Sequence, residues 1–325
     1  MRPIPFIDAD AIRAAVPVEA LLDAIEAAYR DVAEGRDRSP LRTHVPVDGG
    51  DLLLMPGIRE GGRGHTVKLV TVMPGNAERG APTVQAVVAW LDAATGTPLA
   101  LLDGSTVTAM RTGAASGVAT RLLARPDAST LAVIGAGGQA EWQLRAVAAA
   151  RPIRRVLVYA RTPASREAFA ERMAAATGLE VIAVAGARSA VVEADVVCCA
   201  TTASEPVFDA AWLRPGTHVN GVGAFRLGMV ELPPELFARA SRVAVDARHA
   251  AMAEAGDVVA AIRAGLLAEG DLVEIGSVGR DWSATRDEDA ITAFKSVGLA
   301  IQDVAAAELV VARTLGDGDG IPAEV

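Results

Sequence analysis

Apolar residues recur along the chain at two different spacings, which predict helices and strands in different regions. Between residues 12 and 34 they follow the helical period of about 3.6, so a long helix is expected there. Strand-like runs follow at 51–55, 65–72, 83–91 and 98–102. The last two runs are joined by a stretch typical of a hairpin turn, 92–97, and a helix rich in small residues is predicted at 106–123.

A regular alternation of strands and helices begins at residue 130. Apolar strands are predicted at 130–135, 155–159, 179–184, 195–200, 218–222 and 242–246. Helical patterns separate the first four of them, at 138–150, 164–176 and 187–193. This alternation predicts a doubly wound parallel sheet of the Rossmann type. Two further helices are expected at 287–299 and 302–314 before a frayed tail at 316–320, and the last helix is expected to pack on the N-terminal part.

The length of the chain and this change of pattern together predict two domains. At 325 residues the chain is long for a single hydrophobic core. We expect an α+β domain formed by 1–115 together with 299–325, and a dinucleotide-binding Rossmann domain at 116–298. The fold class is therefore predicted to be α/β.

Composition and charge exclude several classes of function. The chain is 51% apolar, but no stretch is long enough to span a bilayer, so a globular protein without a membrane partner is expected. The net charge of −9 and the lack of a basic patch argue against nucleic-acid binding. Cys198 and Cys199 lie in an apolar run, and acidic Asp8 and Asp10 stand where a secretory signal would be apolar, which predicts a cytoplasmic protein. The four histidines lack the spacing of a metal-binding motif, so no metal is predicted.

The strand at 130–135 ends in a glycine-rich turn that carries a clear functional signal. The turn contains Gly135, Gly137, Gly138, Gln139 and Ala140, and a helix follows it directly. In such a G-x-G-x-x-A turn the first glycine permits the tight bend, the second lets the backbone approach a pyrophosphate, and the small last residue keeps the helix close to the strand. The helix N-terminus offers free amides to phosphates, so nicotinamide chemistry is expected.

The residues after the second strand indicate which dinucleotide binds. NAD sites usually place an acid about 20 residues beyond the glycines. Here Arg161, Thr162 and Arg166 follow the strand instead. Arginines suit a 2′-phosphate better than a free ribose diol, so NADPH is the expected cofactor. Because arginines are common on this chain, NADH stays the alternative.

Three cations ahead of the glycine turn form a second candidate site. Lys68 interrupts an otherwise uncharged strand, Arg111 is the one charged residue of 105–115, and Arg42 precedes another expected strand. If they converge they would bind a carboxylate, and the alternative is three ordinary ion pairs. Only Lys68 and Lys295 among 31 basic residues are lysine, either by codon bias or because an ammonium with a tunable pKa is needed there.

A series of short motifs runs along nearly the whole chain. They are Arg42 before His44, Leu54-Met-Pro56, Val67-Lys-Leu-Val-Thr-Val-Met-Pro-Gly75, Leu101-Leu-Asp through Met110-Arg-Thr112, the glycine turn, Asn220-Gly-Val-Gly-Ala224 and Phe294-Lys-Ser-Val-Gly298. The glycine turn alone is weakly specific, but the ordered set resembles the ornithine cyclodeaminase/mu-crystallin family.

This resemblance implies a homodimer whose N-terminal domain and last helix supply the substrate pocket and the dimer surface. In the family, the positions that match Arg42, Lys68 and Arg111 hold the substrate carboxylate beside the nicotinamide. Positions near the cofactor are matched by Thr112, Thr201, Val222 and Lys295. The lysine at 295 is typical of the mu-crystallin-like branch.

Two departures from the cyclodeaminases narrow the expected reaction. Those enzymes carry an aspartate and a glutamate that bind the amino groups of a diamino acid, and Phe225 and Leu53 stand at these positions here. The Ala224-Phe-Arg226 stretch resembles the ketimine reductases, although Leu227 replaces their usual proline. The resemblance therefore implies NADPH-dependent reduction of Δ1-pyrroline-2-carboxylate or Δ1-piperideine-2-carboxylate to proline or pipecolate.

For this reaction the expected catalytic residue is Lys68, which would relay the proton of the imine or, alternatively, only bind the carboxylate. Phe225 is expected to pack against the substrate ring. An alanine-type amino acid dehydrogenase, an ornithine cyclodeaminase and a non-enzymatic NADPH-dependent binding protein are the alternatives. Glu231 is expected to anchor a loop near the cofactor, and Asp246 to be structural.

Overall fold

The computed structural model describes residues 3–279, 282 and 286–316. The chain forms two compact units, one of Met1–Arg111 with Leu299–Val325 and one of Thr112–Gly298. The junction lies inside helix α3 (Gly104–Leu123), the helix in which the sequence analysis placed the boundary after residue 115. Apart from Gly316, the tail expected to be frayed lies outside the described residues.

The first unit is built on a six-stranded sheet with the order β1-β6-β5-β4-β3-β2. Its strands are β1 (Phe6–Ile7), β2 (Thr43–Val47), β3 (Gly50–Gly57), β4 (Gly64–Val72), β5 (Val84–Asp92) and β6 (Pro98–Asp103). Neighbouring strands are antiparallel except for β1 and β6, and β5 and β6 form the predicted hairpin. The helices are α1 (Ala9–Ala15), α2 (Val18–Ala33), a short 3-10 segment η1 (Pro74–Arg79) and α11 (Ala300–Leu315).

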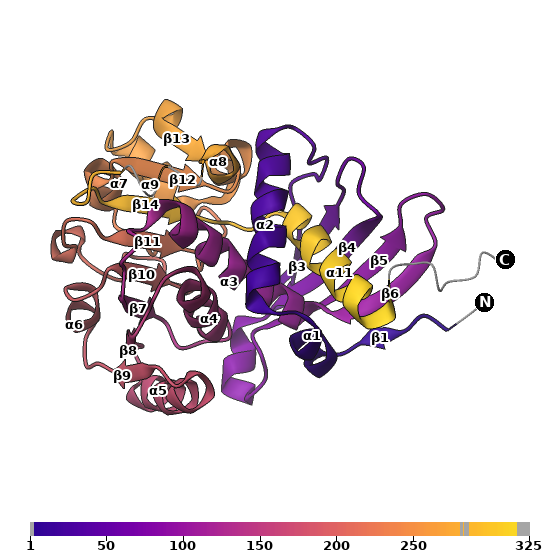
Figure 1. Cartoon of the computed structure of the whole chain (residues 1–325), viewed down its shortest axis with the longest axis horizontal. Helices are drawn as coiled ribbons and strands as arrows, with labels where there is room; N and C mark the ends of the chain where they lie inside the picture. The colour runs from indigo at the N-terminus through magenta and orange to yellow at the C-terminus, as the bar shows by residue number, and fades with distance from the viewer. Residues whose placement is uncertain (1–2, 280–281, 283–285, 317–325) are drawn as a thin grey trace. The chain divides into compact units, whose positions relative to one another are not determined.

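Helix α11 covers one face of this sheet, as was predicted for the last helix. It packs against β3, β4 and β5 as well as α2, and it crosses the strands in Figure 1. Side chains of β4 alternate accordingly: Thr66, Lys68 and Val70 are buried, whereas Leu69 is exposed. The strand period therefore directs Lys68 into the layer between sheet and helix.

The single long helix expected at 12–34 is wrong, because the structure has two helices there. Helix α1 ends at Ala15 and α2 begins at Val18. Pro17 has no amide hydrogen to donate, and its ring disfavours the helical conformation of the residue before it. Val16 is extended as a result.

The second unit contains an eight-stranded sheet, and its strands are all parallel, which confirms the predicted α/β fold class. Its strands are β7 (Thr130–Ile134), β8 (Arg155–Tyr159), β9 (Glu180–Ala183), β10 (Val196–Cys199), β11 (His218–Gly221), β12 (Arg242–Val245), β13 (Leu272–Glu274) and β14 (Thr292–Lys295). The helices are α4 (Ala140–Ala150), α5 (Pro163–Thr177), α6 (Ala187–Val191), α7 (Pro234–Arg239), α8 (Arg248–Glu254) and α9 (Gly256–Arg263).

The order of the strands defines where a ligand binds. The sheet runs β13-β12-β14-β11-β10-β7-β8-β9, so the chain proceeds from β7 outward to β9 and then returns to β10 on the other side of β7. In open parallel sheets such a reversal opens a crevice at the carboxyl ends of the two strands. The glycine turn follows β7 directly and therefore lies at this crevice.

The helix expected at 287–299 is also wrong. Residues 292–295 form β14, which is buried along its whole length between β11 and β12. A short apolar run has no decisive period, and a strand buried on both faces looks like a piece of buried helix in the sequence. Asp246 fixes the end of β14, since it accepts hydrogen bonds from Ser296 Oγ and from the amides of Val297 and Gly298 at 2.7–2.9 Å. Its predicted structural role is confirmed.

Candidate active site

A buried cluster of charges lies between the sheet of the first unit and α11. Lys68 stands on β4 between Met55 of β3 and Val88 of β5, and it is 1% exposed. Its Nζ atom lies 2.8 Å from Asp303 Oδ2 and donates a hydrogen bond to Oδ1 at 3.0 Å. Arg111 Nε donates to the same Oδ1 at 3.2 Å. Two of the three predicted cations thus meet on one carboxylate.

This environment makes Lys68 a group that can exchange a proton near neutral pH. Burial is the main cause that lowers the pKa of Lys68 to about 7; Asp303 opposes it, while the positive charges of Arg111 and Arg42 act in the same direction as burial. The half-buried Arg42 therefore acts on Lys68 as the third member of the predicted set. An ammonium whose pKa lies near the working pH is suited to general acid catalysis.

A second buried residue of α11, Gln302, orients the guanidinium of Arg111. Its Oε1 accepts from Arg111 Nη1 at 3.1 Å and from the amide of Leu299 at 2.7 Å. Its Nε2 donates to the hydroxyl of Tyr29 at 2.7 Å. Because Nε of Arg111 is hydrogen-bonded to Asp303 and Nη1 to Gln302, the plane of the Arg111 guanidinium is fixed.

Sequence reasoning missed Asp303 and Gln302, although a signal for them was present. Both interrupt the apolar run of the last helix, much as Lys68 interrupts its strand, and both are fully buried. A buried charge needs a partner of opposite sign. An acid in an apolar helix and a lysine in an apolar strand could have been paired on that ground.

In the second unit, the glycine turn fits a dinucleotide. Gly135 has φ +109°, and a Cβ atom there would lie 2.7 Å from the carbonyl oxygen of Ala200, so only glycine is tolerated. A Cβ on Gly137 or Gly138 would have open space around it, which leaves room for a phosphate to approach the backbone. The Oε1 atom of Gln139 is buried and finds no hydrogen-bond partner within the described part of the chain. These features suit a bound pyrophosphate at the start of α4.

One buried carboxylate holds the two loops that follow β10 and β11 at the sheet crevice. Glu231 Oε2 accepts from the amide and hydroxyl of Thr201, at 2.9 and 3.0 Å. Its Oε1 accepts from the amides of Gly223 and Ala224, at 2.6 and 3.3 Å. Glycine at 223 is required because a Cβ there would collide with the backbone of Thr201. The expectation that Glu231 anchors a loop is confirmed.

Lys295 lies behind this anchor. Its Nζ is 2.7 Å from Asp257 Oδ2 and 3.7 Å from Glu231 Oε1, and all three side chains are completely buried. Asp257 also accepts from the amides of Glu231 and Leu232. We call Glu231, Asp257 and Lys295 the Glu231 cluster. Lys295 therefore contacts the carboxylate that holds the loops after β10 and β11.

The other predicted cofactor residues lie at the carboxyl ends of strands or beside them. Arg161 and Thr162 are exposed just after β8, and Arg166 donates from Nη1 to the carbonyl of Ala160 at 3.1 Å. Val222 follows β11 and is buried. The carbonyl of Thr112 accepts from Gln143 of α4 at 3.3 Å.

The two residues predicted to form an apolar wall for the substrate ring belong to different units. Phe225 is half-buried in the loop after β11, in the second unit. Leu53 is buried on β3 of the first unit, on the same face as Met55. The contact of these two side chains with one substrate ring stays a prediction.

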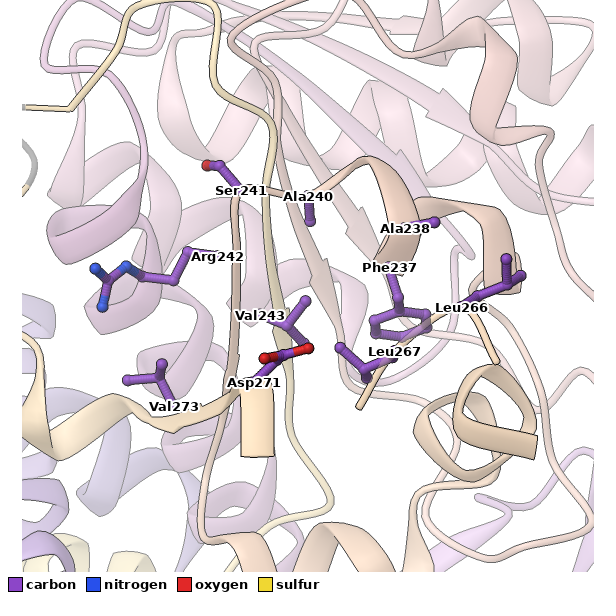
Figure 2. A pocket seen from close by; sticks show the side chains of 10 residues that line it. All are labelled: Phe237, Ala238, Ala240, Ser241, Arg242, Val243, Leu266, Leu267, Asp271 and Val273. Atoms are coloured by element: carbon purple, nitrogen blue, oxygen red, sulfur yellow. The ribbon is translucent and has the colours of Figure 1, made fainter. Parts of the chain in front are cut away.

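A separate cavity of about 390 Å³ lies at the amino ends of β12 and β13 (Figure 2). Phe237, Val243 and Leu267 line it together with Arg242 and Asp271. The Arg242 guanidinium lies over the ring of Trp282, 4.6 Å from its centre. Because ligands of open parallel sheets bind at the carboxyl ends, this cavity is not part of the dinucleotide site.

Within the described ranges, every helix is too short or too polar for a membrane span. The same residues include no group of three or more His, Cys, Asp or Glu side chains arranged to bind a metal ion.

Comparison with known proteins assigns the family. The model of the ornithine cyclodeaminase/mu-crystallin family matches residues 6–318. The chain belongs to this family. A Δ(1)-pyrroline-2-carboxylate reductase of Bacillus cereus is 40% identical over 297 residues, which cover 90% of this chain and 91% of that protein.

Solved structures of similar proteins agree along nearly the whole chain. The Δ(1)-pyrroline-2-carboxylate reductase of Thermococcus litoralis, solved with NADH and L-proline, has a TM-score of 0.90 and 36% identity, covering 96% of this chain and 98% of that one. An archaeal alanine dehydrogenase dimer with bound NAD has a TM-score of 0.86 and 30% identity, covering 96% of each chain.

Proposed function

We propose that this protein is an NADPH-dependent ketimine reductase, which reduces a cyclic ketimine carboxylate such as Δ1-pyrroline-2-carboxylate or Δ1-piperideine-2-carboxylate to proline or pipecolate. The observation that carries the proposal is the buried Lys68, whose pKa of about 7 arises among Arg111, Arg42 and Asp303. The reductases to which the chain is similar act on a substrate of this kind.

The residues of the first unit supply what the substrate needs. Arg42 and Arg111 are permanently charged and suit the carboxylate, since a guanidinium binds carboxylates by paired hydrogen bonds. Lys68 holds a proton for the ring nitrogen, and after giving it up becomes a neutral amine that water reprotonates. Bound substrate carboxylate adds a negative charge near Lys68 and so favours its protonated form.

The residues of the second unit fit the cofactor. NADPH, when bound, supplies the hydride for the imine carbon. The glycine turn and the first amides of α4 would hold its pyrophosphate, and Thr201, Val222 and Ala224 border the same crevice. Arg161, Thr162 and Arg166 lie where the adenosine ribose is expected, which supports a 2′-phosphate, with NADH as the alternative.

A homodimer in the cytoplasm is part of the same proposal. Strand β2 is the edge of its sheet and is exposed along its whole length, including Val45 and Val47. An exposed apolar edge strand is a natural surface for a second copy, and the similar alanine dehydrogenase is a dimer. Cys198 and Cys199 are free and buried, as suits a reducing compartment.

The proposal is tested by following the loss of NADPH absorbance as the reduced nicotinamide is oxidised. The purified protein is given NADPH with either cyclic imine or with pyruvate and ammonia, and Lys68→Met is the matched control. Ornithine with NAD is assayed separately by the ammonia released, because cyclodeamination consumes no net cofactor. We expect turnover of a cyclic imine that the control loses. Turnover only with pyruvate and ammonia would make the protein an amino acid dehydrogenase, and activity only on ornithine a cyclodeaminase. Binding of NADPH without any turnover would favour the non-enzymatic binding protein.

A further inference from the structure

The carboxylate of Asp303 is the feature of the first unit that neither motif nor charge pattern explained. It lies on α11 and is completely buried, and each of its two oxygens contacts a cation. Oδ2 lies against Lys68, and Oδ1 accepts from Lys68 and from Arg111. One side chain thus fixes the distance and the relative orientation of the two cations.

The position of Asp303 is itself well defined. The preceding residue, Gln302, is bonded to the amide of Leu299 at the start of α11 and to the hydroxyl of Tyr29 on α2. These bonds fix the first turn of the helix against its neighbour. Asp303 is therefore presented to β4 by a rigid element, which is what a residue that orients other groups requires.

The charge balance shows what Asp303 does for Lys68. Among the charged groups that act on Lys68, Arg111 and Arg42 are positive and Asp303 is negative, so the charges of these four side chains sum to +2 with Lys68 protonated and to +1 with Lys68 neutral. Without the negative charge of Asp303, burial and the positive charges of Arg111 and Arg42 would lower the pKa of Lys68 further, so Lys68 would hold its proton less tightly. With Asp303, the proton is retained and the site still has a net positive charge for a substrate carboxylate.

We propose that Asp303 is a positioning residue of the reaction, which aligns Lys68 with Arg111 and keeps on Lys68 the proton that the substrate nitrogen receives. In this step an N–H bond of Lys68 breaks and an N–H bond forms on the ring nitrogen, while the hydride completes the reduction at carbon. Lys68 is left as the neutral amine and Asp303 stays ionised throughout. The transfer rests on the proposed function, but the retention of the proton by Asp303 does not.

The small number of lysines makes the retention directly measurable. Protein labelled with 13C-lysine carries only the signals of Lys68 and Lys295, and Lys68→Met identifies which is which. The 13Cε shift of Lys68 is titrated with pH in the wild type, in Asp303→Asn and in Asp10→Asn. The asparagine at 303 keeps the shape and removes the charge. Asp10 is an exposed acid of the same unit and is the control.

We expect the midpoint of the Lys68 titration to fall by about 1–3 pH units in Asp303→Asn and to stay unchanged in Asp10→Asn. The alkaline limb of kcat/KM for imine reduction should move down by the same amount, which a purely structural defect would not produce. Asp303→Glu keeps the charge at a shifted position, so its midpoint should stay near the wild-type value while kcat drops.

The outcomes separate this inference from the proposed function. An unchanged midpoint in Asp303→Asn overturns it, and so does an Asp303→Glu midpoint that falls by about 1 pH unit or more from the wild-type value. The second criterion applies even if Asp303→Asn does not fold. If the wild type reduces no cyclic imine, the proposed function fails, whereas the titrations still decide whether Asp303 holds the proton.

Discussion

Removing the ammonium of Lys295 is expected to destabilise the second unit strongly. Lys295→Met keeps the length of the side chain but leaves the carboxylates of Asp257 and Glu231 buried without their cation. Breaking a buried ion pair by removing one partner costs about 3–5 kcal/mol. Six hydrogen bonds still reach the two carboxylates, four to Glu231 and two to Asp257, so we expect a loss at the low end, about 3 kcal/mol.

The loss should also depend on pH, with a sign that follows from the burial of Glu231. Burial already raises the pKa of Glu231, against the opposing effect of Lys295. Without Lys295 the pKa of Glu231 in the folded protein rises further. At pH values between the pKa of Glu231 in the unfolded chain and its pKa in the folded variant, the folded variant therefore binds more protons than the unfolded chain. Stability then decreases as pH increases, and the penalty relative to the wild type should be smaller at about pH 5 than at about pH 8.

Urea unfolding followed by circular dichroism at both pH values measures these effects. Arg155→Met is the control, because it removes a partly exposed ion pair with Glu193 in the same unit and should cost at most about 1 kcal/mol. Lys295→Met combined with Asp257→Asn should regain part of the lost stability. A Lys295→Met penalty no larger than that of Arg155→Met, or one that is the same at both pH values, would refute the reasoning.

Three further predictions concern activity and cofactor binding. For imine reduction, kcat/KM should fall as pH rises through about 7 because Lys68 loses its proton there, and Lys68→Met should lower kcat/KM by about 10²–10⁴-fold and abolish this limb in a pH–rate profile. Arg161→Ala combined with Arg166→Ala should raise KM for NADPH by about 10²–10⁴-fold with little change for NADH, since each lost charged hydrogen bond is worth about 1.5–3 kcal/mol and two are removed. Steady-state kinetics with both cofactors measure the effect, and equal effects on both would contradict the 2′-phosphate assignment. Gly135→Ala should weaken NADPH binding in a fluorescence titration, because the added Cβ would collide with the carbonyl oxygen of Ala200 and because φ is positive at this position. Gly138→Ala, where a Cβ has open space, should weaken NADPH binding less.

Local patterns were sufficient for most of the second unit. The strand at 130–134, the glycine turn and the helix after it are contiguous in sequence, and the spacing of residues within this stretch predicts them. Local rules also failed at identifiable places. One proline divides the expected helix at 12–34, and the apolar run that forms β14 is too short to show a period. Both errors concern the type or continuity of an element, and neither changes the fold class.

The sequence by itself determined the fold class, the dinucleotide turn and the three cations, because each of these depends on residue type and on the spacing of residues that are close in sequence. Only the tertiary structure decided what those cations touch. Lys68 and Asp303 are 235 residues apart and meet because α11 returns to cover the sheet. Lys295 likewise meets Glu231 and Asp257 through the order of strands in a parallel sheet. A side chain's pKa and role depend on its burial and on the charges beside it, and chain folding alone brings those together.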